Sequence, residues 1–155
     1  MPLRLPELGL LAASLLFAAP VSAQRGHELG IQAIGTASDP VLAVAAVYGA
    51  LRTSTRTRIS ASAGAGVSSG ELGLRGEILG HFLLSPNKLQ GTGFYMAGGV
   101  AGVSGPVEQG YLVLTLGIES RPGATAGWAA ELGVGGGFRL ALGYRWRRHY
   151  SMVRH

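Results

Sequence analysis

The last long segment of the chain alternates between two kinds of side chain, and this pattern constrains the fold more than any other feature. Large apolar and aromatic residues occupy every second position: Phe138, Leu140, Leu142, Tyr144 and Trp146. Arginines and small residues occupy the positions between them: Arg139, Ala141, Gly143 and Arg145. Successive side chains of a β-strand point to opposite faces, so a strand here has one apolar face and one small or charged face.

The same alternation recurs between regularly spaced turn signals. Clusters of Gly, Pro, Ser, Asn and Asp divide the chain into eight segments. These segments cover approximately residues 27–37, 41–52, 57–67, 70–84, 92–103, 109–120, 125–135 and 138–148. Each is close to the roughly 9 to 11 residues that a tilted membrane-spanning strand needs. Segment 41–52 is apolar on both faces and is equally compatible with a short buried helix.

The N-terminus is typical of an exported protein. Arg4 precedes an apolar run at residues 8–19, and the small residues 21–23 offer a cleavage site before Gln24. The run is shorter than the roughly 20 residues of a transmembrane helix, and it lacks the polar face of an amphipathic first helix in a cytosolic domain. We therefore expect a signal peptide at 1–23, a single barrel domain at 24–148 and a basic tail at 149–155.

The composition is unusual for a soluble exported domain. Charged residues are 14% of the chain, against roughly 25% in a typical soluble domain, and Gly accounts for 26 of 155 residues. The chain has no cysteine, so disulfides cannot support it. The net charge of +5 comes largely from C-terminal arginines and from single arginines within strand-like segments. No recognition-helix pattern accompanies it, which argues against nucleic-acid binding.

Alternation alone does not show which face points inward, because soluble barrels and sandwiches alternate as well. The residue types on the two faces favour small and charged residues inside and large apolar residues outside, facing lipid. This orientation predicts a charge network in the lumen formed by Arg58, Arg75, Glu77, Glu119, Glu131, Arg139 and Arg145. It also predicts interface aromatics at Phe94, Trp128, Phe138, Tyr144 and Trp146. A soluble exported barrel and a two-sheet sandwich are the alternatives.

With this pattern the chain resembles the small eight-stranded outer-membrane β-barrels of the OmpA-like and OmpX-like class. The terminal Leu142–Trp146 segment is similar to the aromatic C-terminal strand that the outer-membrane assembly machinery recognises in that class. The resemblance implies an all-β, antiparallel, up-and-down transmembrane barrel in the bacterial outer membrane, with membrane lipid and the assembly machinery as partners. Two features differ from the class: all connections are short, which argues against a loop-borne adhesion role, and nine residues follow Trp146.

Motifs for chemistry are few. Residues 66–70 match G-x-S-x-G, but a strand pattern follows, so a hairpin turn is favoured over a hydrolase elbow. His149 and Ser151 resemble the H-x-S element of PagL-type lipid A deacylases, which implies a base and a nucleophile, but no acidic residue follows to orient the histidine. The four histidines, His27, His81, His149 and His155, lack metal-ligand spacing and are expected to be solvated or at strand ends.

These observations favour a non-enzymatic barrel with a structural or interaction role. Eight strands enclose space for side chains or one small ligand, which argues against an open pore. A lipid A deacylase-like esterase is the first alternative, and a soluble lipocalin-like barrel that binds an apolar ligand is the second. We expect no cofactor and no metal, and the sequence does not indicate the oligomeric state.

Overall fold

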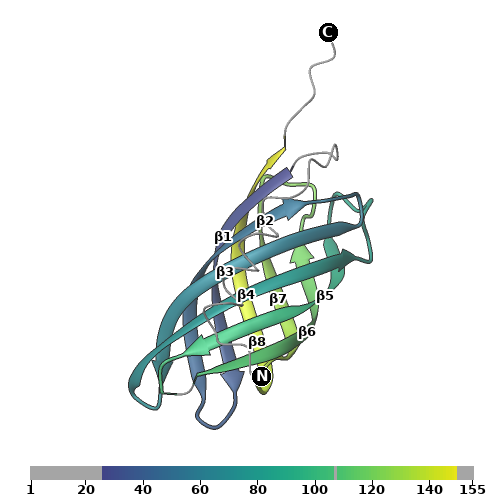
Figure 1. The fold of residues 1–155 in the computed structure, drawn as a ribbon. Helices are drawn as coiled ribbons and strands as arrows, with labels where there is room; N and C mark the ends of the chain where they lie inside the picture. The colour runs from purple at the N-terminus through teal and green to yellow at the C-terminus, as the bar shows by residue number, and fades with distance from the viewer. Residues whose placement is uncertain (1–25, 107, 150–155) are drawn as a thin grey trace.

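The structure, a computed structural model, describes residues 26–106 and 108–149 and consists of eight antiparallel β-strands (Figure 1). The strands are β1 (Gly26–Ala37), β2 (Leu42–Arg52), β3 (Thr57–Ser68), β4 (Glu71–Leu83), β5 (Thr92–Ser104), β6 (Gln109–Ser120), β7 (Ala126–Val134) and β8 (Phe138–His149). The expected signal peptide and residues 150–155 of the expected tail lie outside the described residues. His149 ends β8, one residue beyond the expected end of the barrel.

Each strand pairs with its neighbours in sequence, and β1 also pairs with β8, so the sheet closes on itself. Twelve residue pairs from Gly26↔His149 to Ala37↔Phe138 join these two strands. Closure leaves no strand with unpaired backbone groups along an edge. The expected all-β, eight-stranded, up-and-down barrel is therefore confirmed. Among the described residues, no helix is long and apolar enough to cross a membrane.

The barrel has two ends, which we call the terminus end and the distal end. β1 begins and β8 ends at the terminus end, which also holds the β2–β3, β4–β5 and β6–β7 connections (Figure 1). The distal end holds the other four connections. The β3–β4 connection there consists of Ser69 and Gly70, with φ of 53° and 83°. Two residues with positive φ are typical of a type I′ hairpin turn, so the G-x-S-x-G match belongs to a hairpin.

The exterior of the barrel is apolar on all eight strands. The outward positions carry large exposed side chains, among them Ile31, Val47, Ile59, Leu74, Val100, Leu114, Leu132 and Leu142. In the strands, exposed charged residues occur only near strand ends, at Glu71 and Arg148. This is the reverse of a water-soluble barrel, in which the apolar face lines the core.

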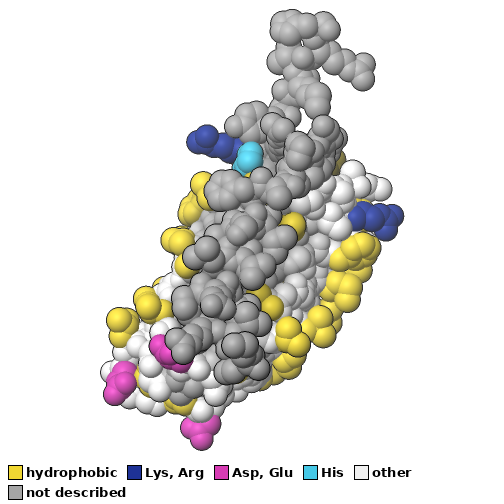
Figure 2. Space-filling model, viewed as in Figure 1, with side chains coloured by type: hydrophobic (Ala, Val, Ile, Leu, Met, Phe, Trp, Pro, Cys, Tyr) yellow, Lys and Arg dark blue, Asp and Glu magenta, His cyan; other side chains and the backbone are white. Residues whose placement is uncertain are grey.

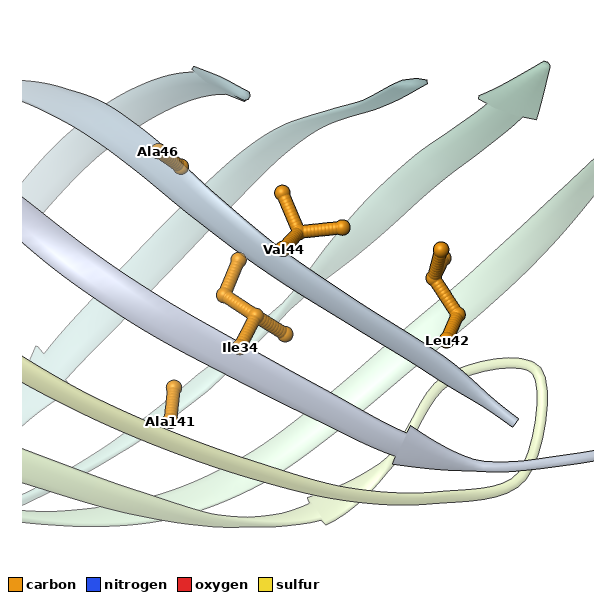
Figure 3. Packing of buried hydrophobic residues seen from close by; sticks show 5 residues of the cluster. All are labelled: Ile34, Leu42, Val44, Ala46 and Ala141. Atoms are coloured by element: carbon orange, nitrogen blue, oxygen red, sulfur yellow. The ribbon is translucent and has the colours of Figure 1, made fainter. Parts of the chain in front are cut away.

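Part of the interior is also apolar. Ile34, Leu42, Val44, Ala46 and Ala141 pack together inside the barrel from β1, β2 and β8 (Figure 3). This cluster explains why segment 41–52 is apolar on both faces: one face is exposed, and the other packs in the lumen. The segment is a strand, so the alternative of a short helix was wrong.

Candidate functional site

Charged side chains fill much of the barrel interior, and they form the candidate site. Five arginines and four glutamates on six strands are buried there: Glu28, Arg58, Arg75, Glu77, Glu119, Glu131, Arg139, Arg145 and Arg147. All seven residues expected in a lumen network are in this set. Alternation places them there, because every strand of a closed barrel turns every second side chain inward.

The part of this set near the distal end is tightly hydrogen-bonded. Glu77 accepts bonds from Arg75 Nε at 2.7 Å and from Arg139 Nη2 at 2.7 Å, one on each carboxylate oxygen. Arg139 Nη1 donates to Glu131 Oε2 at 2.9 Å. Arg75 also donates to the hydroxyl of Thr36 and to the carbonyl of Gly135. Arg139 is completely buried, and its guanidinium links the two carboxylates.

The chain of ion pairs continues toward the terminus end. Arg145 contacts Glu131 at 3.1 Å and Glu119 at 3.6 Å. Glu119 also accepts bonds from Arg58 at 3.2 Å and Arg147 at 3.0 Å. These two arginines then meet Glu28, at 3.0 Å from Arg58 Nη1 and 3.5 Å from Arg147 Nε. The nine residues therefore form one continuous path of alternating charge, which we call the charge ladder.

Two tyrosines complete the ladder from the strands that supply no charge. Tyr95 on β5 donates its hydroxyl to Glu131 at 2.8 Å and accepts a bond from Arg145 at 3.0 Å. Tyr48 on β2 lies beneath the guanidinium of Arg145, 4.6 Å from ring centroid to Cζ. Arg58 lies 5.1 Å from the centroid of Tyr95. A guanidinium over an aromatic face is attracted by the ring quadrupole, so both tyrosines stabilise buried cations.

Gly117 provides the space that Tyr95 occupies. A Cβ at this position would overlap the Tyr95 ring, whose hydroxyl must reach Glu131 across the lumen. This is a position where a missing side chain, and not a special backbone angle, accounts for the glycine.

His81 was expected to be solvated or at a strand end. It does lie near a strand end, but it is buried, so the expectation that it is solvated was wrong. Its ring is 2% exposed inside the barrel, near the end of β4. Arg58 Nη2 lies 3.4 Å from His81 Nδ1, and His81 Nε2 lies 2.7 Å from Ser60 Oγ. Since a guanidinium can only donate, Nδ1 accepts and Nε2 carries the proton. A neutral His81 thus positions Arg58 without adding a charge to the ladder.

Sequence reasoning missed two members of the ladder, Glu28 and Arg147. Arg147 lies on the same face of its strand as Arg139 and Arg145, but it was counted among the C-terminal arginines and not among the lumen residues. Glu28 lies between the outward His27 and Leu29, so the alternation within segment 27–37 indicates that Glu28 points into the lumen. Assigning every residue of the first and last strands to the inward or outward face would have found both residues.

The arrangement of the ladder carboxylates does not favour acid–base chemistry. Each ladder carboxylate contacts at least two guanidinium groups, so no adjacent pair of carboxylates is left to share a proton. The described part of the chain contains no group of three His, Asp or Glu residues that could hold a metal ion. The ladder can instead fill the lumen and hold strands from opposite sides of the barrel together.

A small polar cavity lies at the distal end, beyond the ladder. Its volume is about 150 Å³, and its lining includes Thr36, Asp39, Arg75, Gln109 and Tyr111. Arg75 forms part of its wall while its guanidinium remains bonded to Glu77 and Thr36.

The remaining expected residues lie outside the lumen. The five aromatics predicted for the membrane interface all project outward from the barrel and are 42–55% exposed: Phe94, Trp128, Phe138, Tyr144 and Trp146. The rings of Tyr144 and Trp146 form an edge-on pair with centroids 5.3 Å apart. Ser151 and the side chain of His149, the residues of the deacylase alternative, lie outside the described residues.

Comparison with solved structures places this architecture among known barrels. The structure is similar to the N-terminal β-barrel domain of OprF from Pseudomonas aeruginosa, with a TM-score of 0.64 and 14% sequence identity. The match covers 81% of this chain and 98% of that domain. No protein-family model and no curated protein matches the chain. At this identity the similarity shows the fold, and it confirms the resemblance to small eight-stranded OmpA-like barrels at that level.

We expect Glu131→Gln to lower the free energy of unfolding by about 3–5 kcal/mol, the usual cost of removing one partner from a buried ion pair. The substitution removes the charge that separates Arg139 from Arg145. Glu71→Gln at the exposed start of β4 is the matched control and should change the unfolding free energy by less than about 0.5 kcal/mol. Equilibrium urea unfolding measures both, and equal effects would show that Glu131 is not held by the ladder.

Proposed function

We propose that this protein is a small bacterial outer-membrane β-barrel with a structural or interaction role and no open pore. The observation that carries the proposal is the distribution of side chains about the closed sheet. Large apolar residues face outward on all eight strands, and arginines and glutamates face inward. A bilayer requires this arrangement, because its core can accept apolar side chains but not unpaired backbone groups or charges.

The outward-facing apolar residues of the eight strands form a belt around the barrel. The aromatic residues at the two ends of this belt support a membrane-spanning position. Trp128 is the third residue of β7 and Trp146 the fourth from the end of β8, so both lie toward the terminus end. Phe94 lies at the same end of β5, and Phe138 begins β8 at the distal end. Aromatic rings at both limits of an apolar belt are typical of outer-membrane barrels, where they sit at headgroup depth.

The side chains that fill the lumen support the proposal that the barrel has no open pore. The ladder crosses the interior from Arg75 to Glu28, and Tyr48 and Tyr95 project into the same space. The apolar cluster around Ile34 and Val44 fills a further part of it. The interior of an eight-stranded barrel is wide enough for side chains to fill or for one small ligand, and not for an open channel.

The alternatives have less support. A soluble barrel with this exterior would place leucines and aromatics of every strand in water. Ser151 and the side chain of His149, on which the deacylase alternative depends, lie outside the described residues, so the structure adds nothing in its support. The connections at the distal end are short, so an interaction role would use the belt or the rims. The partners that we expect are outer-membrane lipid and, during biogenesis, the assembly machinery.

Cell fractionation tests the location. The expressed full chain should be recovered with the outer membrane, and its gel mobility should change on boiling, because a closed barrel resists detergent until heated. Recovery in the soluble periplasmic fraction would contradict the proposal.

Substitutions at two depths test the lipid-facing belt. Leu114 is exposed at the middle of β6, whereas Val41 is exposed just before β2 at the distal end. Leu114→Arg should cost about 2–4 kcal/mol in vesicles and Val41→Arg about 0–1 kcal/mol, because the penalty for an arginine falls toward the interface. Equilibrium unfolding from vesicles measures the difference. Equal costs would show that Leu114 does not face hydrocarbon.

Conductance recordings test the filled lumen. The protein inserted into a planar bilayer should give no stable conductance steps, because the charge ladder and tyrosines occupy the path that water would take. Parallel heat-modifiability of the same sample establishes that the protein is folded. Regular ion-conducting steps from folded protein would contradict the absence of a pore.

A further inference from the structure

The exposed charges of the barrel are segregated by sign between its two ends. Within the described ranges, 26–106 and 108–149, every exposed basic side chain lies at the terminus end. These residues are Arg56, Lys88, Arg121 and Arg148, which we call the basic rim. Every exposed acidic side chain in the same ranges lies at the distal end, namely Asp39, Glu71 and Glu108. Figure 2 shows this division, with dark blue side chains at one end and magenta ones at the other.

The basic rim runs around the barrel and is not one cluster. Arg56 lies in the β2–β3 connection, Lys88 in β4–β5 and Arg121 in β6–β7, and Arg148 lies near the end of β8. No ion pair among the described residues engages these four side chains. The five arginines of the charge ladder, by contrast, all contact glutamates. The two sets of cations therefore have different roles, and the rim presents its charge to the surroundings.

The rim is continuous with the aromatic part of the belt. Trp128 and Trp146 lie a few residues inside it, and Ser120 Oγ, next to Arg121, accepts a bond from the backbone N–H of Trp128 at 3.0 Å. Moving outward along the barrel, a lipid would meet aliphatic side chains, then aromatic rings, then cations. This order matches acyl chains, the glycerol region and phosphate in a phospholipid leaflet.

We propose that the basic rim binds the phosphate groups of anionic phospholipids in the leaflet that surrounds the terminus end. The inference rests on the proposed membrane insertion and adds a lipid class and a side to it. Anionic lipids are the occupant that the geometry favours, because the cations are distributed around the circumference where annular lipids lie and directly border the apolar belt. A globular acidic partner would need a compact patch.

The two tryptophans of the chain report directly on these lipids. Trp128 and Trp146 are the only tryptophans, and both lie near the rim. The full chain is folded into mixed bilayers of phosphatidylcholine and phosphatidylglycerol in which one or the other lipid carries brominated acyl chains. Bromine quenches tryptophan at short range, so the two quenching levels give the relative binding of anionic over zwitterionic lipid. The expected preference is about fivefold, which corresponds to roughly 1 kcal/mol for one cation near an anionic surface.

The variant Arg56→Gln/Lys88→Gln/Arg121→Gln/Arg148→Gln removes all four rim charges and should bring this preference close to one. Salt at about 1 M, where the Debye length is about 3 Å, should do the same for the unaltered chain. The matched control removes two of the three acidic charges at the opposite end with Glu71→Gln and Glu108→Gln and should keep the preference.

Quenching by brominated phosphatidylcholine alone separates the two proposals. Its absence would contradict membrane insertion and, with it, the lipid site. Normal quenching with a preference of one in the unaltered chain, or an equal preference in the rim variant, would overturn the lipid site and leave membrane insertion intact.

Discussion

Pairing of buried arginines with buried glutamates is the constraint on which the rest of the structure depends. Five guanidinium groups and four carboxylates lie inside the barrel, where an unpaired charge costs several kcal/mol. The ladder meets this requirement in part through partners from strands on different sides of the barrel: Arg139 on β8 contacts Glu77 on β4, and Arg58 on β3 contacts Glu119 on β6. These pairs form only when the sheet is closed and its register is correct. The ladder therefore selects one register among those that backbone pairing alone would permit.

The same constraint determines the exterior. Because side chains alternate, a slip of β8 by one residue would turn Arg139 and Arg145 toward lipid and Leu140 and Tyr144 into the lumen. Both changes would be unfavourable in a bilayer, so the inner and outer faces specify the register together. Gly117 and Tyr95 show how finely the interior is fitted, since a methyl group at one position would displace the hydroxyl that bridges Glu131 and Arg145.

The sequence predicted the fold and most of the ladder because both depend on the alternation of inward and outward side chains along each strand, which is a local property of the sequence. Strands such as β8, with apolar and charged residues in strict alternation, were assigned correctly in position and orientation. β2 was ambiguous because its inward face, with Leu42 and Val44, packs against Ile34 on β1, and sequence gives no sign of that contact. The contacts of His81 with Arg58 and Ser60 could not be predicted either, because they depend on the register in which β3 pairs with its neighbour β4, with Arg58 directly opposite His81.

The separation of interior and surface charge limits where this protein can interact. The ladder uses its charges internally, and the belt offers only apolar surface, so polar recognition is left to the two rims. These rims are unlike: the terminus end is basic and borders two tryptophans, and the distal end is acidic with short connections. A symmetric bilayer gives no reason for such a difference, whereas leaflets of different headgroup charge do, because each rim then meets a different potential. For a barrel inserted as we propose, the axial division of charge would thus define a direction in the membrane that its apolar belt does not.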